Sequence, residues 1–364
     1  MPRRNAPEAS GQDDGLPQRR DSSRCVQKTG GGEANGTRNL SPAPTRGVLS
    51  CYVIPSMFDS IDETLETLAD HDYVADEGVA TSLFLALRMG KALLLEGEPG
   101  VGKTELAKVV AHATGAPLIR LQCYEGLDLQ QAVYEWDYPR QLLAVQSKAI
   151  GGKADAGTEL DEIYTEAFLL RRPLLQALDP EADRAPVLLI DELDRADEEF
   201  ESFLLELLSD FQVTIPEIGT LQAKHRPITF LTSNRTREIH DALKRRCVFQ
   251  WIDYPSAERE LEIVRTKLPG IGQRLLRESV HFVQRLRQLD LDKKPGVAET
   301  LDWAEALSHL GAEKLERAQV EKTLGFLLKY QDDVDQVRGQ AASLIDDATA
   351  SAPVSPDQKR VVAG

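Results

Sequence analysis

Short apolar runs alternate with helical patterns along the middle of this chain. Runs that are apolar at every position are typical of strands buried on both faces of a sheet. Strands that alternate with helices form a parallel sheet covered by helices on both sides. We therefore expect an α/β fold with five strands, at Ala92–Leu95, Leu118–Cys123, Val187–Ile190, Ile228–Leu231 and Val248–Ile252.

Helical patterns fill much of the sequence between these runs. Ser60-Ile61-Asp62-Glu63 is a capping box, in which Ser60 caps the first turn of a helix and Glu63 bonds back to it. Two more helices are expected over Glu77–Met89 and Lys103–Ala113. A later helix has a core stripe at i, i+3, i+4, i+7 and i+8, which consists of Phe200, Phe203, Leu204, Leu207 and Leu208. It is followed by a predicted β-hairpin, Phe211–Ile215 with Thr220–Ala223.

Composition suggests four segments. Residues 1–56 are rich in Gly, Pro, Ser, Asn and Arg without periodicity, so we expect disorder or an extension upstream of a natural start at Met57. The α/β core then covers 57–254, a small helical domain 255–348 and a tail 349–364. Within the core, the small residues of Gly151–Gly157 indicate a mobile loop.

Charge and hydropathy exclude several classes of protein. The chain has 364 residues, 41% of them hydrophobic, and a net charge of −16. No apolar run approaches the ~18 residues of a membrane span, and no apolar stretch follows Arg3 and Arg4, so we expect a cytoplasmic protein. The four cysteines are scattered, which argues against a metal or disulfide framework. The acidic body argues against a broad nucleic-acid surface, because phosphate contacts need clustered Lys and Arg.

One segment has the spacing G-x-x-x-x-G-K-[ST] of a phosphate-binding loop. It consists of Gly97, Glu98, Pro99, Gly100, Val101, Gly102, Lys103 and Thr104. Its glycines let backbone N–H groups turn toward phosphate oxygens. Lys103 would reach the β- and γ-phosphates of ATP, and the Thr104 hydroxyl would bind Mg²⁺. The alternative is a glycine-rich turn that matches by chance, but a position between a strand and a helix favours the phosphate loop.

Two further groups follow buried strands. Asp191 and Glu192 come directly after Val187–Ile190, where parallel sheets bind ligands. Asp191 would hold Mg²⁺ and Glu192 would activate the attacking water, although an acidic helix start is the simpler reading. Asn234 follows the next strand and could contact both the γ-phosphate and the water, or be a turn residue or helix cap.

A basic cluster lies further along the chain. Lys244-Arg245-Arg246 could supply a cation to the transferring phosphoryl group, from a neighbouring subunit. The simpler reading is a basic helix C-terminus that complements the helix dipole.

In this order the four groups resemble those of AAA+ ATPases. The phosphate loop is similar to Walker A, Val187–Glu192 to Walker B, Asn234 to sensor 1, and Arg246 to the arginine finger, with Arg245 as the fallback. The hairpin at 211–224 resembles that of the MoxR branch. Four segments are similar to the CoxD type, whose members are associated with maturation of carbon monoxide dehydrogenase: Tyr134–Tyr138, Phe203–Pro216, Ala242–Cys247 and Gly296–Trp303.

One position departs from this resemblance. Many relatives carry a sensor-2 arginine on a helix of the lid, whereas this chain has Glu299 and Thr300 there. The lid would then sense nucleotide in another way, or its coupling to nucleotide would be weaker. A lid arginine such as Arg274 could also substitute.

The resemblance implies an ATP- and Mg²⁺-dependent remodelling chaperone that acts on a client metalloenzyme such as a molybdenum hydroxylase. It also implies a ring-shaped homo-oligomer, a hexamer, and a von Willebrand factor A domain protein as partner. Two alternatives are a nucleic-acid-directed ATPase, such as a loader or helicase component, and a P-loop kinase for a small molecule. The acidic body disfavours the first, and Glu192 with Asn234 favours water over a metabolite as the phosphoryl acceptor.

Overall fold

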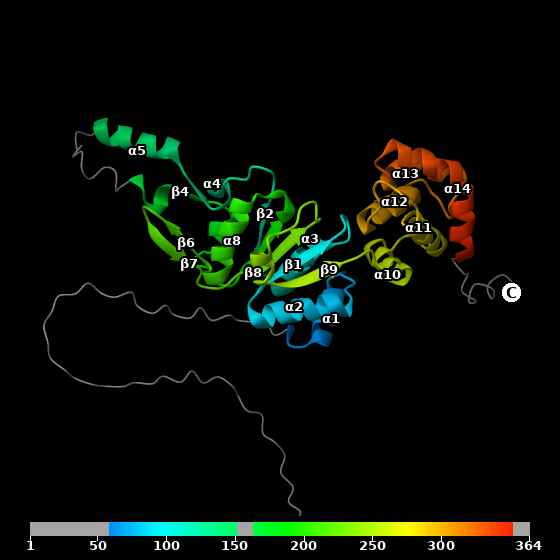
Figure 1. Cartoon of the computed structure of the whole chain (residues 1–364), viewed down its shortest axis with the longest axis horizontal. Helices are drawn as coiled ribbons and strands as arrows, with labels where there is room; N and C mark the ends of the chain where they lie inside the picture. Colours follow the sequence, from blue (N-terminus) through cyan, green and yellow to red (C-terminus); the bar gives the residue numbers. More distant parts are fainter. Residues whose placement is uncertain (1–57, 151–162, 352–364) are drawn as a thin grey trace, which may run out of the picture. The chain divides into compact units, whose positions relative to one another are not determined.

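The computed structural model describes residues 58–150 and 163–351. The predicted N-terminal tail at 1–56 and the predicted loop Gly151–Gly157 lie outside these residues. Helices and strands account for most of the described chain (Figure 1).

Five parallel strands form the central sheet. Their order is β2-β5-β8-β1-β9, so β8 lies between β5 and β1. The predicted parallel sheet is therefore confirmed, with strand ends that differ from the prediction by up to two residues. The strands are β1 (Ala92–Gly97), β2 (Leu118–Gln122), β5 (Val187–Asp191), β8 (Ile228–Ser233) and β9 (Cys247–Ile252).

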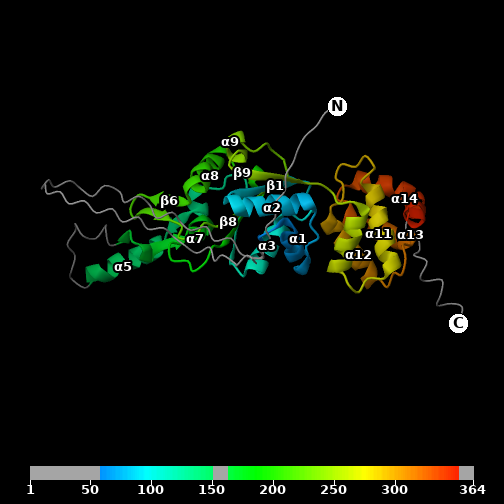
Figure 2. The same cartoon turned by 90° about the horizontal axis from the view of Figure 1, so that it is seen from below.

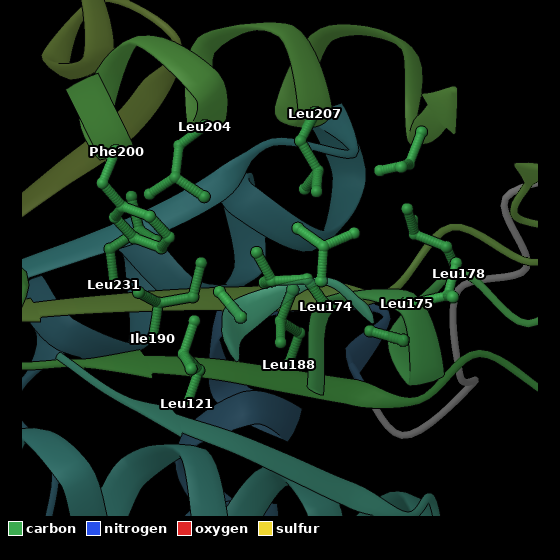
Figure 3. Close-up of a cluster of buried hydrophobic side chains, with 14 of the residues drawn as sticks. Leu121, Leu174, Leu175, Leu178, Leu188, Ile190, Phe200, Leu204, Leu207 and Leu231 are labelled. Atoms are coloured by element: carbon green, nitrogen blue, oxygen red, sulfur yellow. The ribbon is translucent and has the colours of Figure 1, made fainter. Parts of the chain in front are cut away.

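Helices cover both faces of this sheet because successive side chains on each strand point to opposite sides. On one face, Leu188, Ile190 and Leu231 pack beneath the helix α8 (Figure 3). The partners on α8 are Phe200, Leu204 and Leu207. On the other face, Leu189 and Phe230 pack against α1, α2 and α3. These helices are α1 (Ile61–Asp70), α2 (Glu77–Met89), α3 (Lys103–Thr114) and α8 (Glu198–Asp210).

The start of α1 differs in one detail from the predicted capping box. The Ser60 hydroxyl accepts a hydrogen bond from the Glu63 N–H, as expected. The Glu63 carboxylate, however, accepts from the N–H of Asp59 and not from that of Ser60.

Smaller elements lie between the main strands. Between β2 and β5 the chain forms an antiparallel pair, β3 with β4, together with short helices and the longer α5 (Figure 1). Between α8 and β8 it forms the predicted hairpin, β6 with β7. Their bounds are α4 (Leu129–Ala132), β3 (Tyr134–Trp136), α5 (Tyr138–Ile150), η2 (Glu166–Phe168), β4 (Leu169–Arg171), α7 (Pro173–Ala177), η3 (Leu193–Arg195), β6 (Gln212–Ile215), β7 (Gly219–Gln222) and α9 (Asp241–Lys244).

The C-terminal part is a bundle of helices, which we call the lid (Figure 2). Trp303 and Phe282 stack at its centre with ring centroids 5.2 Å apart. Its core is separate from the two cores that flank the sheet. The helices are α10 (Ala257–Lys267), α11 (Gln273–Leu286), α12 (Val297–His309), α13 (Arg317–Leu327) and α14 (Gln331–Ser351). In the described ranges, no helix is both long and apolar enough to cross a membrane.

Candidate active site

The predicted phosphate loop connects β1 to α3. Gly100 has φ +74° and Gly102 has φ +97°, which are conformations that residues with a Cβ adopt only at a cost. Gly97 is required for a different reason, since a Cβ there would lie 2.0 Å from the carbonyl oxygen of Ile252 on β9. The loop therefore needs its glycines both for its turn and for close packing against the neighbouring strand.

Lys103 is buried at the first position of α3. Its ammonium donates hydrogen bonds of 2.7 Å to the carbonyl oxygens of Gly97 and Glu98. Burial lowers the pKa of Lys103 from 10.5 to about 8, and nearby carboxylates, with that of Asp194 foremost, offset only part of this effect. A phosphate oxygen would therefore either accept the third N–H of the ammonium or replace one of these carbonyls.

Asp191, at the end of β5, is the most heavily hydrogen-bonded group of the site. Its Oδ1 accepts from the hydroxyls of Thr104, at 2.9 Å, and of Thr232. Its Oδ2 accepts from Nε and Nη2 of Arg120, at 3.0 and 2.5 Å. A carboxylate held by four donors has a fixed orientation.

The pair of Thr104 and Asp191 fits Mg²⁺. Magnesium takes oxygen ligands and commonly uses only one or two protein groups, with water and substrate phosphates as the rest. Here a hydroxyl and a carboxylate lie 2.9 Å apart at the end of the phosphate loop. In the two described ranges no cluster of three or more His, Cys, Asp or Glu side chains could hold a metal by itself. The pair of Thr104 and Asp191 therefore suits a Mg²⁺ ion that is also held by the phosphates of a nucleotide.

Glu192 has an unusual backbone conformation for a residue with a side chain. Its φ of +55° and ψ of +49° lie in the left-handed region, which costs free energy and is often found at functional sites. Its N–H donates to the Thr232 hydroxyl at 3.0 Å. Its carboxylate pairs with Arg195 at 2.9 Å and is about one-third exposed. The carboxylate thus lies at the edge of the cavity, where a single arginine holds it.

Asn234 follows β8, and Asp194 holds its segment in place. The two carboxylate oxygens of Asp194 accept from the N–H groups of Asn234 and Thr236, at 3.2 and 2.9 Å. Burial by itself would raise the pKa of Asp194, but the hydrogen bonds from Thr236 and Asn234 outweigh it and hold this pKa below its usual value. The charged carboxylate therefore connects the loop after β5 to the tip of β8.

Arg245 and Arg246 do not reach the chain's own cavity. Both are exposed and neither is among the residues that line it. Arg246 donates from Nε to the Ser209 hydroxyl at 3.0 Å. Lys244 lies 3.6 Å from the buried carboxylate of Glu96 on β1. The basic cluster therefore does not line the cavity of its own chain.

A cavity of about 610 Å³ brings the other predicted residues together. It is lined by the loop from Pro99 to Thr104, by Asp191 and Glu192, and by Asn234. Residues of the lid, among them Val297 and Ala298, complete its wall. Gly97 and Glu98, the first two residues of the loop, do not line the cavity and contact Lys103 through their carbonyl oxygens.

The lid has no arginine at this cavity. Arg274, the alternative considered from the sequence, donates from Nε to Glu278 on its own helix at 2.7 Å and lines a different surface hollow. That alternative was wrong, because the buried Glu278 carboxylate binds the guanidinium. Glu299 accepts from the N–H of Gly296 and so caps α12, while Thr300 is buried and bonded to Glu260.

Three residues of the site were missed by sequence reasoning: Arg120, Thr232 and Asp194. Arg120 is a charged residue within a predicted strand, and Thr232 a polar residue near the end of another. A polar residue in such a strand indicates a polar contact if the neighbouring strand ends in a carboxylate. This neighbourhood depends on the strand order, which local patterns do not provide.

Comparison with known proteins agrees with this geometry. Residues 92–247 match the family of AAA domains of the dynein-related subfamily. The fold is also similar to solved structures of RuvB from Thermotoga maritima. The branch migration motor is 16% identical, with a TM-score of 0.39, and 76% of this chain and 73% of that one are covered. A RuvB mutant is 16% identical, with a TM-score of 0.41 and coverage of 75% and 73%. The match to an AAA domain covers residues 92–247, and the site within these residues supports ATPase activity.

Proposed function

We propose that this chain is a ring-forming AAA+ remodelling chaperone that uses ATP hydrolysis to mature a metalloenzyme, of the molybdenum hydroxylase class to which carbon monoxide dehydrogenase belongs. Residues 57–254 would form the nucleotide-binding core, 255–348 the lid and 349–364 a tail, with the protein in the cytoplasm.

The convergence of groups around the cavity carries the ATPase part of this proposal. A cationic lysine, a hydroxyl–carboxylate pair, a second carboxylate and an amide line one cavity. They come from the ends of two neighbouring strands, β5 and β8, and from the loop after β1 with the start of α3. Hydrolysis of a phosphoanhydride needs charge neutralisation, a metal position and an oriented water, and this set supplies a residue for each.

Each residue has a proposed role in hydrolysis. Thr104 and Asp191 would hold Mg²⁺, which supplies charge neutralisation at the phosphates when bound. Lys103 would move its ammonium from the loop carbonyls to the phosphate oxygens. Glu192 would orient a water molecule and accept its proton, after release from Arg195, and Asn234 would position the same water. Of the other loop residues, Glu98, Val101 and the glycines would present backbone N–H groups, while Pro99, which has no N–H, would only shape the loop.

The position of the basic cluster supports assembly into a ring, which we propose to be a hexamer. Arg246, or Arg245 in its place, is exposed and outside its own cavity. A cation supplied by a neighbouring subunit would make turnover depend on assembly.

The client and partner proposals depend on the sequence motifs. The segments that are similar to the CoxD type favour a metalloenzyme client and a von Willebrand factor A domain protein as partner. No described residues form a metal-binding cluster of their own, so the chain would act on the client protein and not carry its metal.

The first test is turnover by the purified full chain with Mg²⁺ and ATP. We expect ADP and phosphate as products. Glu192→Gln should bind ATP and lose turnover, because the amide cannot accept the proton of water. Turnover that survives in this variant would exclude the role of Glu192. A phosphorylated metabolite as the product would instead indicate a kinase, and stimulation by DNA or RNA would indicate a nucleic-acid-directed ATPase.

The second test concerns the client. In a host that makes carbon monoxide dehydrogenase, Glu192→Gln should lower the copper and molybdenum content of that enzyme without lowering its amount. A normal metal content in the variant strain would refute the client assignment and leave the ATPase assignment intact.

A further inference from the structure

The first turn of α12 in the lid lies directly against the phosphate loop. The N–H of Ala298 donates to the carbonyl oxygen of Gly100 at 3.1 Å. A Cβ added to Gly296 would lie 2.6 Å from the carbonyl oxygen of Pro99 and 3.0 Å from the Cα of Gly100. The two backbones therefore approach as closely as glycine allows.

This contact constrains a peptide group of the loop. In a trans peptide the C=O and the N–H point in opposite directions. A hydrogen bond that holds the Gly100 carbonyl therefore also sets the direction of the Val101 N–H, one of the amides available to a phosphate. Gly100 has φ +74°, in the region where glycine moves freely, so an external contact has most influence at this position.

A buried ionic cluster holds the same turn from the lid side. Arg287, at the end of α11, donates from both terminal nitrogens to the carboxylate of Glu260 on α10, each at 2.7 Å. Its Nε donates to the carbonyl oxygen of Pro295 at 2.8 Å, next to Gly296. The side chain of Glu260 is fully buried and that of Arg287 is 6% exposed.

Thr300 connects this cluster to α12 itself. Its hydroxyl donates to Glu260 at 2.7 Å and lies 3.0 Å from the carbonyl oxygen of Gly296. The Arg287 guanidinium also stacks on Tyr254, 4.7 Å from the ring centroid, in the segment that leads from β9 to α10. A buried ion pair breaks only at a high cost, so the turn has one position relative to α10 and α11.

We propose that the lid acts on the nucleotide site through the main chain. The turn Gly296–Ala298 supports the loop at Pro99–Gly100, and Arg287, Glu260 and Thr300 are positioning residues that hold this turn. In this chain a backbone contact, and not an arginine side chain, couples the lid to the phosphates. The inference rests on the proposed nucleotide function of the loop.

Two matched substitutions test the contact. Gly296→Ala places a methyl group between the turn and the loop, at a backbone conformation, φ −81° and ψ −176°, that alanine adopts freely. Gly272→Ala is the control, since Gly272 also precedes a lid helix as its N-cap, has φ −61°, and an added Cβ meets nothing within 4 Å. Both variants replace glycine by alanine at the N-cap of a lid helix.

The measurement is the Kd for a fluorescent ATP analogue with Mg²⁺, together with hydrogen exchange of the Ala298 amide in the full chain. Gly296→Ala should weaken binding by about tenfold or more, which is ~1.4 kcal/mol, and should speed exchange at Ala298. Gly272→Ala should match the unchanged protein in both. Equal Kd values for the two variants would overturn the inference but not the proposed function. If neither the unchanged protein nor Gly272→Ala binds the analogue, the nucleotide function fails and the inference with it.

A second pair keeps the test decisive if Gly296→Ala does not fold. Thr300→Val removes the hydroxyl that joins α12 to Glu260, and Thr300→Ser retains it. We expect the valine variant to bind the analogue more weakly and to show faster exchange at Ala298, with both restored in the serine variant. A valine variant that is folded and binds as tightly as the serine variant would show that the cluster does not position the turn.

Discussion

Replacing Arg120 by glutamine should destabilise the chain more without Mg²⁺-ATP than with it. The substitution removes the guanidinium that donates twice to Oδ2 of Asp191. The Asp191 side chain is 4% exposed and that of Arg120 is 50% exposed. The carboxylate is thus buried while its cation remains in contact with water.

The expected size follows from these contacts. A hydrogen bond to a charged group contributes roughly 1.5–3 kcal/mol, and glutamine can still donate one. Because water screens the half-exposed guanidinium, we expect a loss near the lower end, about 1–2 kcal/mol. For a protein of this size that corresponds to a decrease in Tm of about 1–4 °C. Bound Mg²⁺ would place another cation near Asp191 and so replace part of what is lost.

The assay is thermal unfolding of the full chain in EDTA and in Mg²⁺-ATP. Arg120→Gln should show its full decrease in Tm in EDTA and less than half of it with Mg²⁺-ATP. The control is Arg88→Gln, which breaks an exposed ion pair with Asp59 of 2.8 Å. Neither residue lines the cavity, so this variant should give the same small change in both conditions. A decrease for Arg120→Gln that is equal in the two conditions would refute the idea that Arg120 and Mg²⁺ neutralise the same carboxylate.

Three other predictions concern neighbouring parts of the site. Only the protonated form of Lys103 attracts phosphate, and the pKa of this residue in the folded chain is about 8. The Kd for ATP should therefore be constant at pH values below 8 and increase at higher pH. A Kd that stays constant from pH 7 to 9 would contradict this prediction. Arg246→Ala should bind ATP and lose turnover, and mixing it with Glu192→Gln subunits should restore part of the activity; rings shown to mix but to remain inactive would exclude a finger in trans. Glu201→Gln should lower the free energy of unfolding by roughly 2–4 kcal/mol, because the buried carboxylate accepts from Arg237 and from a backbone N–H; a thermal melt like that of the unchanged protein would argue against this.

The elements of the fold could be predicted from local patterns, because each apolar run has a single interpretation. Val187–Ile190 is apolar at every position and Ile228–Leu231 at every position except Thr229, and both are strands inside the sheet. Helix α2 was predicted with the bounds that the structure has. The prediction was less complete at the cap of α1, where the choice between two neighbouring N–H groups depends on how the chain enters the helix.

Part of the candidate site could also be predicted from local patterns in the sequence. The loop from Gly97 to Thr104 is local in sequence, since the backbone turn and the positions of Lys103 and Thr104 depend on residues next to one another. The strand-end residues Asp191 and Asn234 were also identifiable, because the carboxyl ends of parallel strands meet at one edge of the sheet.

Only the tertiary structure decided which groups act on these residues. Arg120 reaches Asp191 because β2 lies beside β5, and Thr232 reaches it because β8 lies on the other side. Gly296 and Ala298 contact the phosphate loop across almost two hundred residues of sequence. The sequence by itself determined a nucleotide-binding loop in an α/β fold, because that chemistry is encoded by adjacent residues. The neutralisation of Asp191 and the support of the loop by the lid depend on strand order and helix packing, which are set by the whole core and not by any local pattern.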